Sequence, residues 1–287
     1  RLGVNASNLR YHLTQASFAA LNANGSANTL GLTASYPLAR RTDFNLSLTG
    51  SIDDKRLIDR TVAGETGNRH VAVANLGLSG HAQARFPGDG ATIFGAALTV
   101  GTSDERNAAA RAADQITRQI QGSFTKLAYN AGYQYPFSNA TSLVATLRGQ
   151  FASKNLDSSE RMSLGGPNTV RAYPGGEATG DEAWLATLGL SHKLGDTLAA
   201  NVFVDTGGVT LNRNLWANWN AANPRLTNRY TLSGIGIGLD WRVGPAVVTA
   251  SIATPLGSNP GRDANDKNID GSPQHRTRGW IGANAQF

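Results

Sequence analysis

The chain has 287 residues, a net charge of +6, 33 glycines and no cysteine. The lack of cysteine excludes disulfides and cysteine-ligated metals, and it suits passage through an oxidising periplasm. The basic residues are dispersed and form no Lys/Arg-rich run, so the charge does not indicate a nucleic-acid partner. Because no stretch of 18 or more apolar residues occurs, a transmembrane helix is excluded as well.

Apolar and polar residues alternate along short segments from the start of the chain. In residues 44–53, for example, Phe44, Leu46 and Leu48 share one face and polar residues share the other. Because successive side chains of a strand point to opposite faces, each segment predicts a strand with one apolar side. The pattern predicts about twelve strands, at residues 2–11, 28–37, 44–53, 71–85, 91–102, 118–136, 142–151, 182–193, 198–205, 231–242, 246–256 and 276–287.

The predicted connections alternate between short and long. Short turns follow Tyr36, Arg85, Tyr135, Lys193 and Arg242. Long polar stretches, one of which predicts a short exposed helix over 105–118, occupy residues 12–27, 54–69, 103–117, 154–181, 212–229 and 257–275. Membrane barrels have tight periplasmic turns and long external loops, whereas a soluble β-sandwich, the alternative, has no reason to place every long loop at one end.

This layout predicts an all-β fold, an antiparallel transmembrane β-barrel over residues 1–287 in the outer membrane of a Gram-negative bacterium. Membrane lipid and lipopolysaccharide would surround it, and we expect a monomer. The last predicted strand ends in Phe287, and a C-terminal aromatic residue resembles the signal that the barrel assembly machinery recognises. Counting strands back from a periplasmic Phe287 places loop 154–181 at the external end.

Loop 154–181 differs from the other long loops, which look solvated. Glycines that permit tight or left-handed backbone and prolines that fix turns flank its centre, namely Gly165, Gly166, Gly175, Gly176, Pro167 and Pro174. Between them lie Val170, Arg171, Ala172 and Tyr173. Apolar and aromatic residues in an external loop indicate a loop that folds against another surface, and the barrel lumen is the buried surface within reach.

The segment Leu164–Tyr173, with the sequence LGGPNTVRAY, resembles the VRGY-like sixth-loop motif of the Omp85 superfamily. With the residues that follow as far as Trp184, it resembles the two-partner-secretion transporters, the haemolysin-activator and filamentous-haemagglutinin-transporter family. A second family motif, an aspartate on the strand two after this loop, matches Phe203–Gly207. Ala172 stands where glycine is commoner in the family. The resemblance covers the whole chain in pattern and these two motifs in detail.

The resemblance implies a sixteen-stranded barrel preceded by a plug helix and two POTRA domains. We therefore expect this chain to be the last 12 strands of such a barrel, with a long inward-folded sixth loop and without the POTRA domains. The first residue, Arg1, is not methionine, which agrees with a processed or truncated chain. A true twelve-strand barrel is the alternative.

The resemblance also implies that Arg171 pairs with Asp205 inside the lumen. The strand alternation places Asp205 on the polar face independently, and a guanidinium can bind a carboxylate through two hydrogen bonds. The alternative is that both residues are simply solvated. The candidate functional residues are those of the loop motif and its facing strand, namely Gly165, Gly166, Val170, Arg171, Ala172, Tyr173, Phe203, Asp205 and Gly207.

Basic residues on the predicted polar faces suggest a basic, anion-preferring lumen, although ordinary solvation explains them equally well. They are Arg85, Lys126, Arg148, Lys193, Arg242 and Arg278. The sequence has no nucleophile–base motif and its histidines lack metal-ligand spacing, so we expect neither an enzyme nor a cofactor. Residues 263–271 have aspartates near calcium-loop spacing but lack the terminal glutamate of a calcium loop.

The resemblance implies an outer-membrane translocator that exports one large exoprotein of the haemolysin, haemagglutinin or contact-inhibition type. The alternatives are an Omp85-type assembly factor for outer-membrane proteins, which shares the loop motif, and a passive porin, which lacks it.

Overall fold

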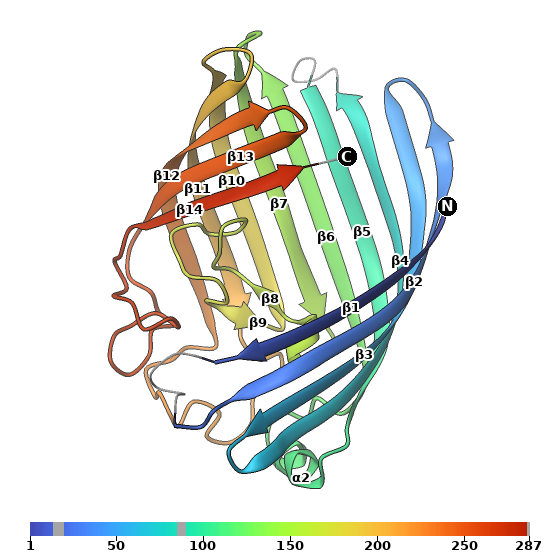
Figure 1. Cartoon of the computed structure of the whole chain (residues 1–287), viewed down its shortest axis with the longest axis vertical. Coiled ribbons are helices and arrows are strands. Elements are labelled where there is room, and N and C mark those ends of the chain that lie inside the picture. The colour runs from blue at the N-terminus through green and yellow to red at the C-terminus, as the bar shows by residue number, and fades with distance from the viewer. Residues whose placement is uncertain (14–19, 85–89, 286–287) are drawn as a thin grey trace.

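The computed structural model describes residues 1–13, 20–84 and 90–285. Twelve strands form one antiparallel sheet that curves around a hollow, and neighbours in the sheet follow chain order (Figure 1). The strands are β1 (Leu2–His12), β2 (Asn24–Arg40), β3 (Phe44–Thr61), β4 (Gly64–Ala84), β5 (Gly90–Glu105), β6 (Gly122–Pro136), β7 (Thr141–Ala152), β10 (Glu182–Lys193), β11 (Leu198–Thr210), β12 (Arg229–Val243), β13 (Ala246–Pro255) and β14 (Arg278–Ala285).

Three further elements lie in the connections. A helix, α2 (Ala108–Ile116), follows β5, and loop 154–181 contains η1 (Ser158–Glu160) and a small hairpin of β8 (Met162–Ser163) and β9 (Thr179–Gly180). The short helix predicted over 105–118 is therefore present as α2, and none of its residues is buried. No helix in the part of the chain that the structure describes is long and apolar enough to cross a membrane.

The prediction of a long polar loop over 54–69 is wrong. Strand β3 extends to Thr61 and β4 begins at Gly64, so a tight hairpin replaces the loop. Polar residues such as Lys55 and Arg69 face other charged groups on the concave side of the sheet. Their polarity therefore resembled that of a solvated loop, although most of this backbone is paired between β3 and β4.

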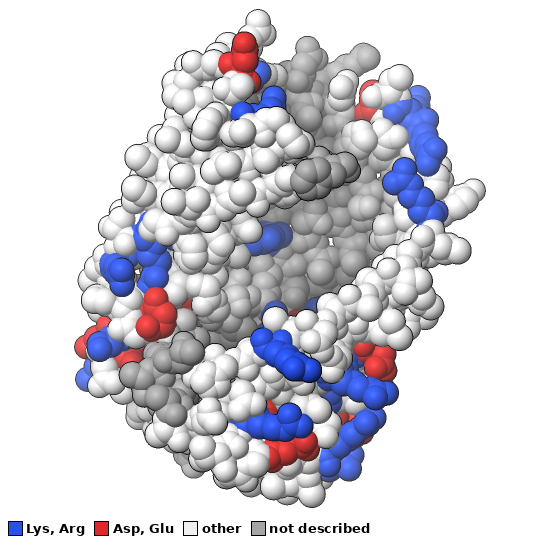
Figure 2. All heavy atoms as spheres, in the orientation of Figure 1, with Lys and Arg blue, Asp and Glu red and all other residues white. Residues whose placement is uncertain are grey.

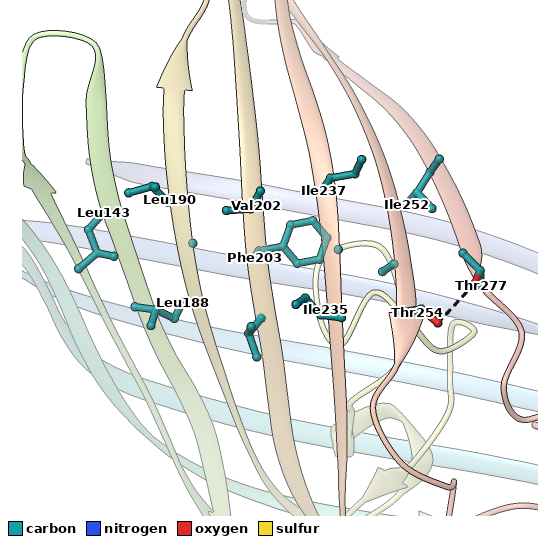
Figure 3. A pocket seen from close by; sticks show the side chains of 14 residues that line it. Leu143, Leu188, Leu190, Val202, Phe203, Ile235, Ile237, Ile252, Thr254 and Thr277 are labelled. Atoms are coloured by element: carbon teal, nitrogen blue, oxygen red, sulfur yellow. Dashed lines mark hydrogen bonds between the residues drawn. The ribbon is translucent and has the colours of Figure 1, made fainter.

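The outer face of the sheet is apolar and exposed. On β12 and β13, Ile237 is 60% and Ile252 is 55% exposed, whereas Phe203, which points to the concave side from β11, is 4% exposed. Outward aliphatic side chains of four adjacent strands, from Leu188 to Ile252, form one continuous surface (Figure 3). Charged side chains gather toward the two ends of the molecule on the face shown in Figure 2. An apolar band between charged ends is the pattern of a membrane-embedded barrel.

The two edges of the sheet remain separate. Within the described residues, β1 pairs only with β2 and β14 pairs only with β13. The alternative of a closed twelve-strand barrel is therefore not what these residues form (Figure 1). Two sequence predictions, the assembly signal at Phe287 and the lumen position of Arg85, lie outside the described residues.

Candidate functional site: the loop on the concave side

Loop 154–181 leaves β7, folds back against the concave side of the sheet and returns to β10 (Figure 1). Val170, Ala172 and Tyr173 are fully buried. They pack with Leu164 against inward side chains of the strands β10 to β13, namely Ala183, Leu185, Phe203, Val209, Leu232 and Ala253. The larger apolar core of this protein thus lies between the loop and the inner wall.

The loop backbone doubles back tightly at its glycines. The amides of Leu164 and Gly165 both donate to the carbonyl oxygen of Glu177, at 3.1 and 3.0 Å. A side chain on Gly165 would collide with the carbonyl oxygen of Pro174. Gly166 has a φ of 138°, a conformation that other residues rarely adopt. The glycines of the motif therefore allow the loop to fold, and the residues between them make the contacts.

Arg171 and Asp205 are brought together on the concave side. The Nε and Nη2 groups of Arg171 each donate to a different carboxylate oxygen of Asp205 at 2.8 Å. The backbone amide of Arg171 adds a bond of 3.1 Å, and the Thr187 hydroxyl adds one of 2.8 Å. Asp205 is fully buried, so four donors surround a carboxylate that water does not reach. A buried negative charge of this kind is tolerated because hydrogen-bond donors surround both of its oxygens.

Strand β11 presents three residues of one face to the loop. The Arg171 guanidinium carbon lies 3.1 Å from the centre of the Phe203 ring, which adds a cation–π contact to the ion pair. Figure 3 shows that ring extending from β11 over β12. A Cβ on Gly207 would lie 2.9 Å from Leu164 of the loop. In the Phe203–Gly207 motif, the first residue therefore stacks on the guanidinium, the aspartate binds it and the glycine makes room.

Ala172 sits against a glycine of the neighbouring strand. A Cβ on Gly234 of β12 would lie 2.5 Å from the Ala172 Cβ, closer than such atoms approach. Gly234 is part of the contact surface for the loop, and the sequence motif did not indicate it. Ala172 fits at a position where the family has glycine more often, because the strand residue that faces it, Gly234, has no side chain.

Trp280 is a second residue that the sequence did not single out. Its indole N–H donates to the backbone carbonyl of Arg171 at 2.7 Å, so β14 also contacts residues 170–173, the tip of the loop. The sequence held one signal for this residue. In the last predicted strand, Trp280 lies between the outward residues Gly279 and Ile281, so its own side chain is on the inward face. A tryptophan on a polar face needs a partner for its N–H, and the loop supplies it.

Replacing Trp280 by phenylalanine should have a small effect, because one neutral hydrogen bond contributes about 1 kcal/mol. We expect the unfolding temperature of the purified protein to fall by about 2–4 °C. Trp241→Phe, which changes an indole exposed on the outer face, is the control. A loss in Trp280→Phe no larger than in this control would argue against the contact.

Glu177 connects the loop to the segment between β13 and β14. Its two carboxylate oxygens accept hydrogen bonds from the Asn259 side chain at 2.9 Å and from the Ile269 amide at 2.8 Å. Burial raises the pKa of Glu177, against the opposite effect of these two donors. In the same segment, Asp263 accepts from two backbone amides and Asp270 pairs with Arg278 at 2.9 Å. Within the described residues, no group of three acidic or histidine side chains could hold a metal ion.

Several of the predicted lumen cations are engaged by loops. Lys126 binds Glu160 at 2.9 Å, Arg148 donates to the carbonyl of Asn168 at 2.6 Å, and Arg278 pairs with Asp270. Lys193 and Arg242 are exposed, near the ends of β10 and β12 that lie away from loop 154–181. These partners weaken the argument for a basic lumen, and anion preference stays a prediction that reversal potentials would test.

The apolar outer face, the hollow on the other side and the inward-folded loop define an outer-membrane barrel of the Omp85 type. The sequence profile of the haemolysin secretion/activation protein family ShlB/FhaC/HecB matches residues 1–241, and the chain belongs to this family. The family is one of outer-membrane transporters of Gram-negative bacteria rather than enzymes. The fold, the family and the location expected from the sequence are confirmed.

Two curated relatives and two solved structures show the extent of the similarity. The heme/hemopexin transporter protein HuxB of Haemophilus influenzae (strain 86-028NP) is 27% identical over 282 residues, which cover 96% of this chain and 47% of HuxB. The outer membrane transporter CdiB of Dickeya dadantii (strain 3937) is 27% identical over 123 residues, 34% of this chain and 22% of CdiB.

The structure of CdiB from Escherichia coli aligns with a TM-score of 0.70 and 18% identity, over 99% of this chain and 50% of that one. The structure of CdiB from Acinetobacter baumannii aligns with a TM-score of 0.66 and 15% identity, over 98% and 46%. At these identities the structures show the fold. The chain spans about half the length of HuxB and of these two structures.

Proposed function

We propose that the chain is the membrane part of a two-partner-secretion transporter, which exports one large exoprotein across the outer membrane. The observation that carries the proposal is the inward-folded loop, fixed by Arg171 to Asp205, in a member of a haemolysin secretion family. The relatives are named a heme/hemopexin transporter and an outer membrane transporter, which supports a transport role, and the family is named for haemolysin secretion. The client that we propose is a protein of the haemolysin, haemagglutinin or contact-inhibition type.

The concave wall suits an unfolded client. Its inward residues include exposed, uncharged polar side chains such as Asn130 and Thr146, which alternate with the outward aliphatic residues. The backbone amides and carbonyls of an extended chain need hydrogen-bond partners wherever bulk water is excluded. Uncharged polar side chains supply such partners without a strong, specific bond. Export of an unfolded chain is therefore compatible with the chemistry of this wall.

Depletion of the full-length transporter from the native bacterium tests the proposal. We expect the exoprotein to disappear from the medium and to remain in the cell envelope, while the amounts of other outer-membrane barrels stay unchanged. A general loss of those barrels would contradict the proposal in favour of an assembly factor. Unchanged export together with lost uptake of small solutes would favour a passive porin.

The outer face supports membrane lipid and lipopolysaccharide as further partners. Outward side chains of β10 to β13 line a shallow apolar groove of about 610 Å³, including Leu190, Val202, Ile235 and Ile252. Acyl chains are the natural occupants of such a surface, since burying it removes apolar area from water. Recognition of Phe287 by the barrel assembly machinery and a monomeric state also belong to the proposal.

A further inference from the structure

The base of loop 154–181 carries a cluster of ion pairs that is separate from the Arg171–Asp205 pair. At its centre is Glu160, whose side chain is 4% exposed. Its two carboxylate oxygens bind two lysines, Lys55 at 2.6 Å through Oε1 and Lys126 at 2.9 Å through Oε2. Lys55 comes from β3 and Lys126 from β6. One carboxylate thus connects two parts of the wall that are not neighbours in the sheet.

The separation of these strands shows what the bridge spans. Strands β3 and β6 are three places apart in the sheet, which corresponds to about 14 Å along it at the usual strand spacing. The long lysine side chains and the curvature of the sheet bring both ammonium groups to Glu160. Gln150 of β7 also donates to the Glu160 backbone carbonyl at 3.1 Å.

Neighbouring residues strengthen the same attachment. The fully buried Leu156 packs against Val71, Val73, Phe124 and Ala152 of the inner wall. Asp157, also buried, binds Arg69 of β4 at 2.9 Å. Apolar packing and ion pairs therefore fix residues 156–160, the root of the loop, to β3, β4, β6 and β7.

The root and the tip of the loop are attached to opposite parts of the sheet. The tip contacts β11, β12 and β14 through Asp205, Gly234 and Trp280. The root contacts the strands that come earlier in the chain. Between the two attachments the loop crosses the concave side (Figure 1).

We infer that Glu160 is a positioning residue that anchors the root of loop 154–181 independently of the Arg171–Asp205 pair at its tip. The loop is then attached to both parts of the wall, at its root and at its tip, and transport depends on both attachments. The last clause rests on the proposed function, whereas the first concerns the loop alone. Removing the Glu160 charge leaves two largely buried ammonium groups without a counter-charge, which a structure tolerates poorly.

This chain contains no cysteine, so cysteines introduced in pairs for spin labels are unique within it, and any cysteine elsewhere in the full-length transporter is first replaced by serine. In the full-length transporter, labels at Ser158 and Ile52 report the root, and labels at Asn168 and Val202 report the tip. All four positions are exposed. Pulsed electron resonance then gives the distribution of each distance, without any client present.

We expect Glu160→Gln to broaden the root distribution and to leave the tip distribution narrow, while Asp205→Asn does the reverse. Glu65→Gln, the same change at an exposed position of the β3–β4 hairpin, should alter neither distribution. Replacing Glu160, Lys55 and Lys126 together by glutamine removes every unpaired charge and should restore part of the narrow root distribution.

A root distribution that stays narrow in Glu160→Gln would overturn the anchor, and so would equal broadening of both distributions. Export should fall by about tenfold in Glu160→Gln, since breaking a buried ion pair releases the segment that it holds. A loosened root with unchanged export would overturn the dependence of transport on the anchor. A wild-type protein that exports nothing would instead refute the proposed function, with the distances still valid.

Discussion

Replacing Asp205 by asparagine should reduce export of the client by at least about a hundredfold, because breaking a buried ion pair costs about 3–5 kcal/mol. The carboxylate accepts four hydrogen bonds, from Arg171 and Thr187. Asparagine has nearly the same shape, but it has no charge and it turns an NH₂ group toward these donors. The expected result is a loop whose tip leaves the wall while the strands remain folded. The amount of client in the culture medium measures the effect.

The matched control for this experiment is Asp196→Asn, which changes an exposed aspartate in the short turn between β10 and β11. It should leave export unchanged. Heat-modifiable migration on gels shows whether each variant is a folded barrel. A folded Asp205→Asn protein that exports as well as the control would contradict the role of the pair.

The second large effect is expected for Gly234→Val. The new side chain would enter the space of Ala172, whose Cβ lies 2.5 Å from the position of a Cβ on Gly234. Valine favours strands, so the sheet itself should not be weakened by its backbone preference. We therefore expect a folded protein with a displaced loop tip and at least about tenfold lower export, because overpacking forces neighbouring groups apart.

Gly189→Val is the comparison for this variant. Gly189 belongs to β10, and a Cβ there would meet its nearest neighbours at 3.4 and 3.7 Å, ordinary contact distances. Export close to wild type is expected. If Gly234→Val also exported normally, export would not require the close contact between Ala172 and β12. Other residues would then have to hold the loop tip against the wall.

The sequence predicts the roles of Asp205 and Gly234 unequally well. Alternation placed Asp205 on the polar face, and the resemblance at Leu164–Tyr173 suggested its partner, since both signals are local in sequence. Gly234 gave no such signal, because a glycine in a strand has several possible causes. Only the contact with Ala172 identifies its role.

The role of Glu160 could not be predicted from the sequence. Its partner Lys55 lies 105 residues earlier in the chain, in a stretch that looked like a solvated loop. Strand pattern follows from near neighbours along the chain, and it therefore predicted the twelve strands of the curved sheet correctly. The path of a long loop depends on contacts with distant strands, which one sequence does not reveal. The same reason explains why Trp280 was missed although its strand was predicted.

The proposed function requires a client polypeptide to pass along the concave side of this barrel. Photo-crosslinking in cells that hold a stalled client tests it directly, with a crosslinking residue at Thr146 or Leu147 of β7 in the full-length transporter. These neighbours point to opposite sides of the sheet, Thr146 inward and Leu147 toward lipid. Crosslinks to the client from Thr146 and none from Leu147 are the predicted result. Equal crosslinking from both positions, or none from Thr146, would contradict the account.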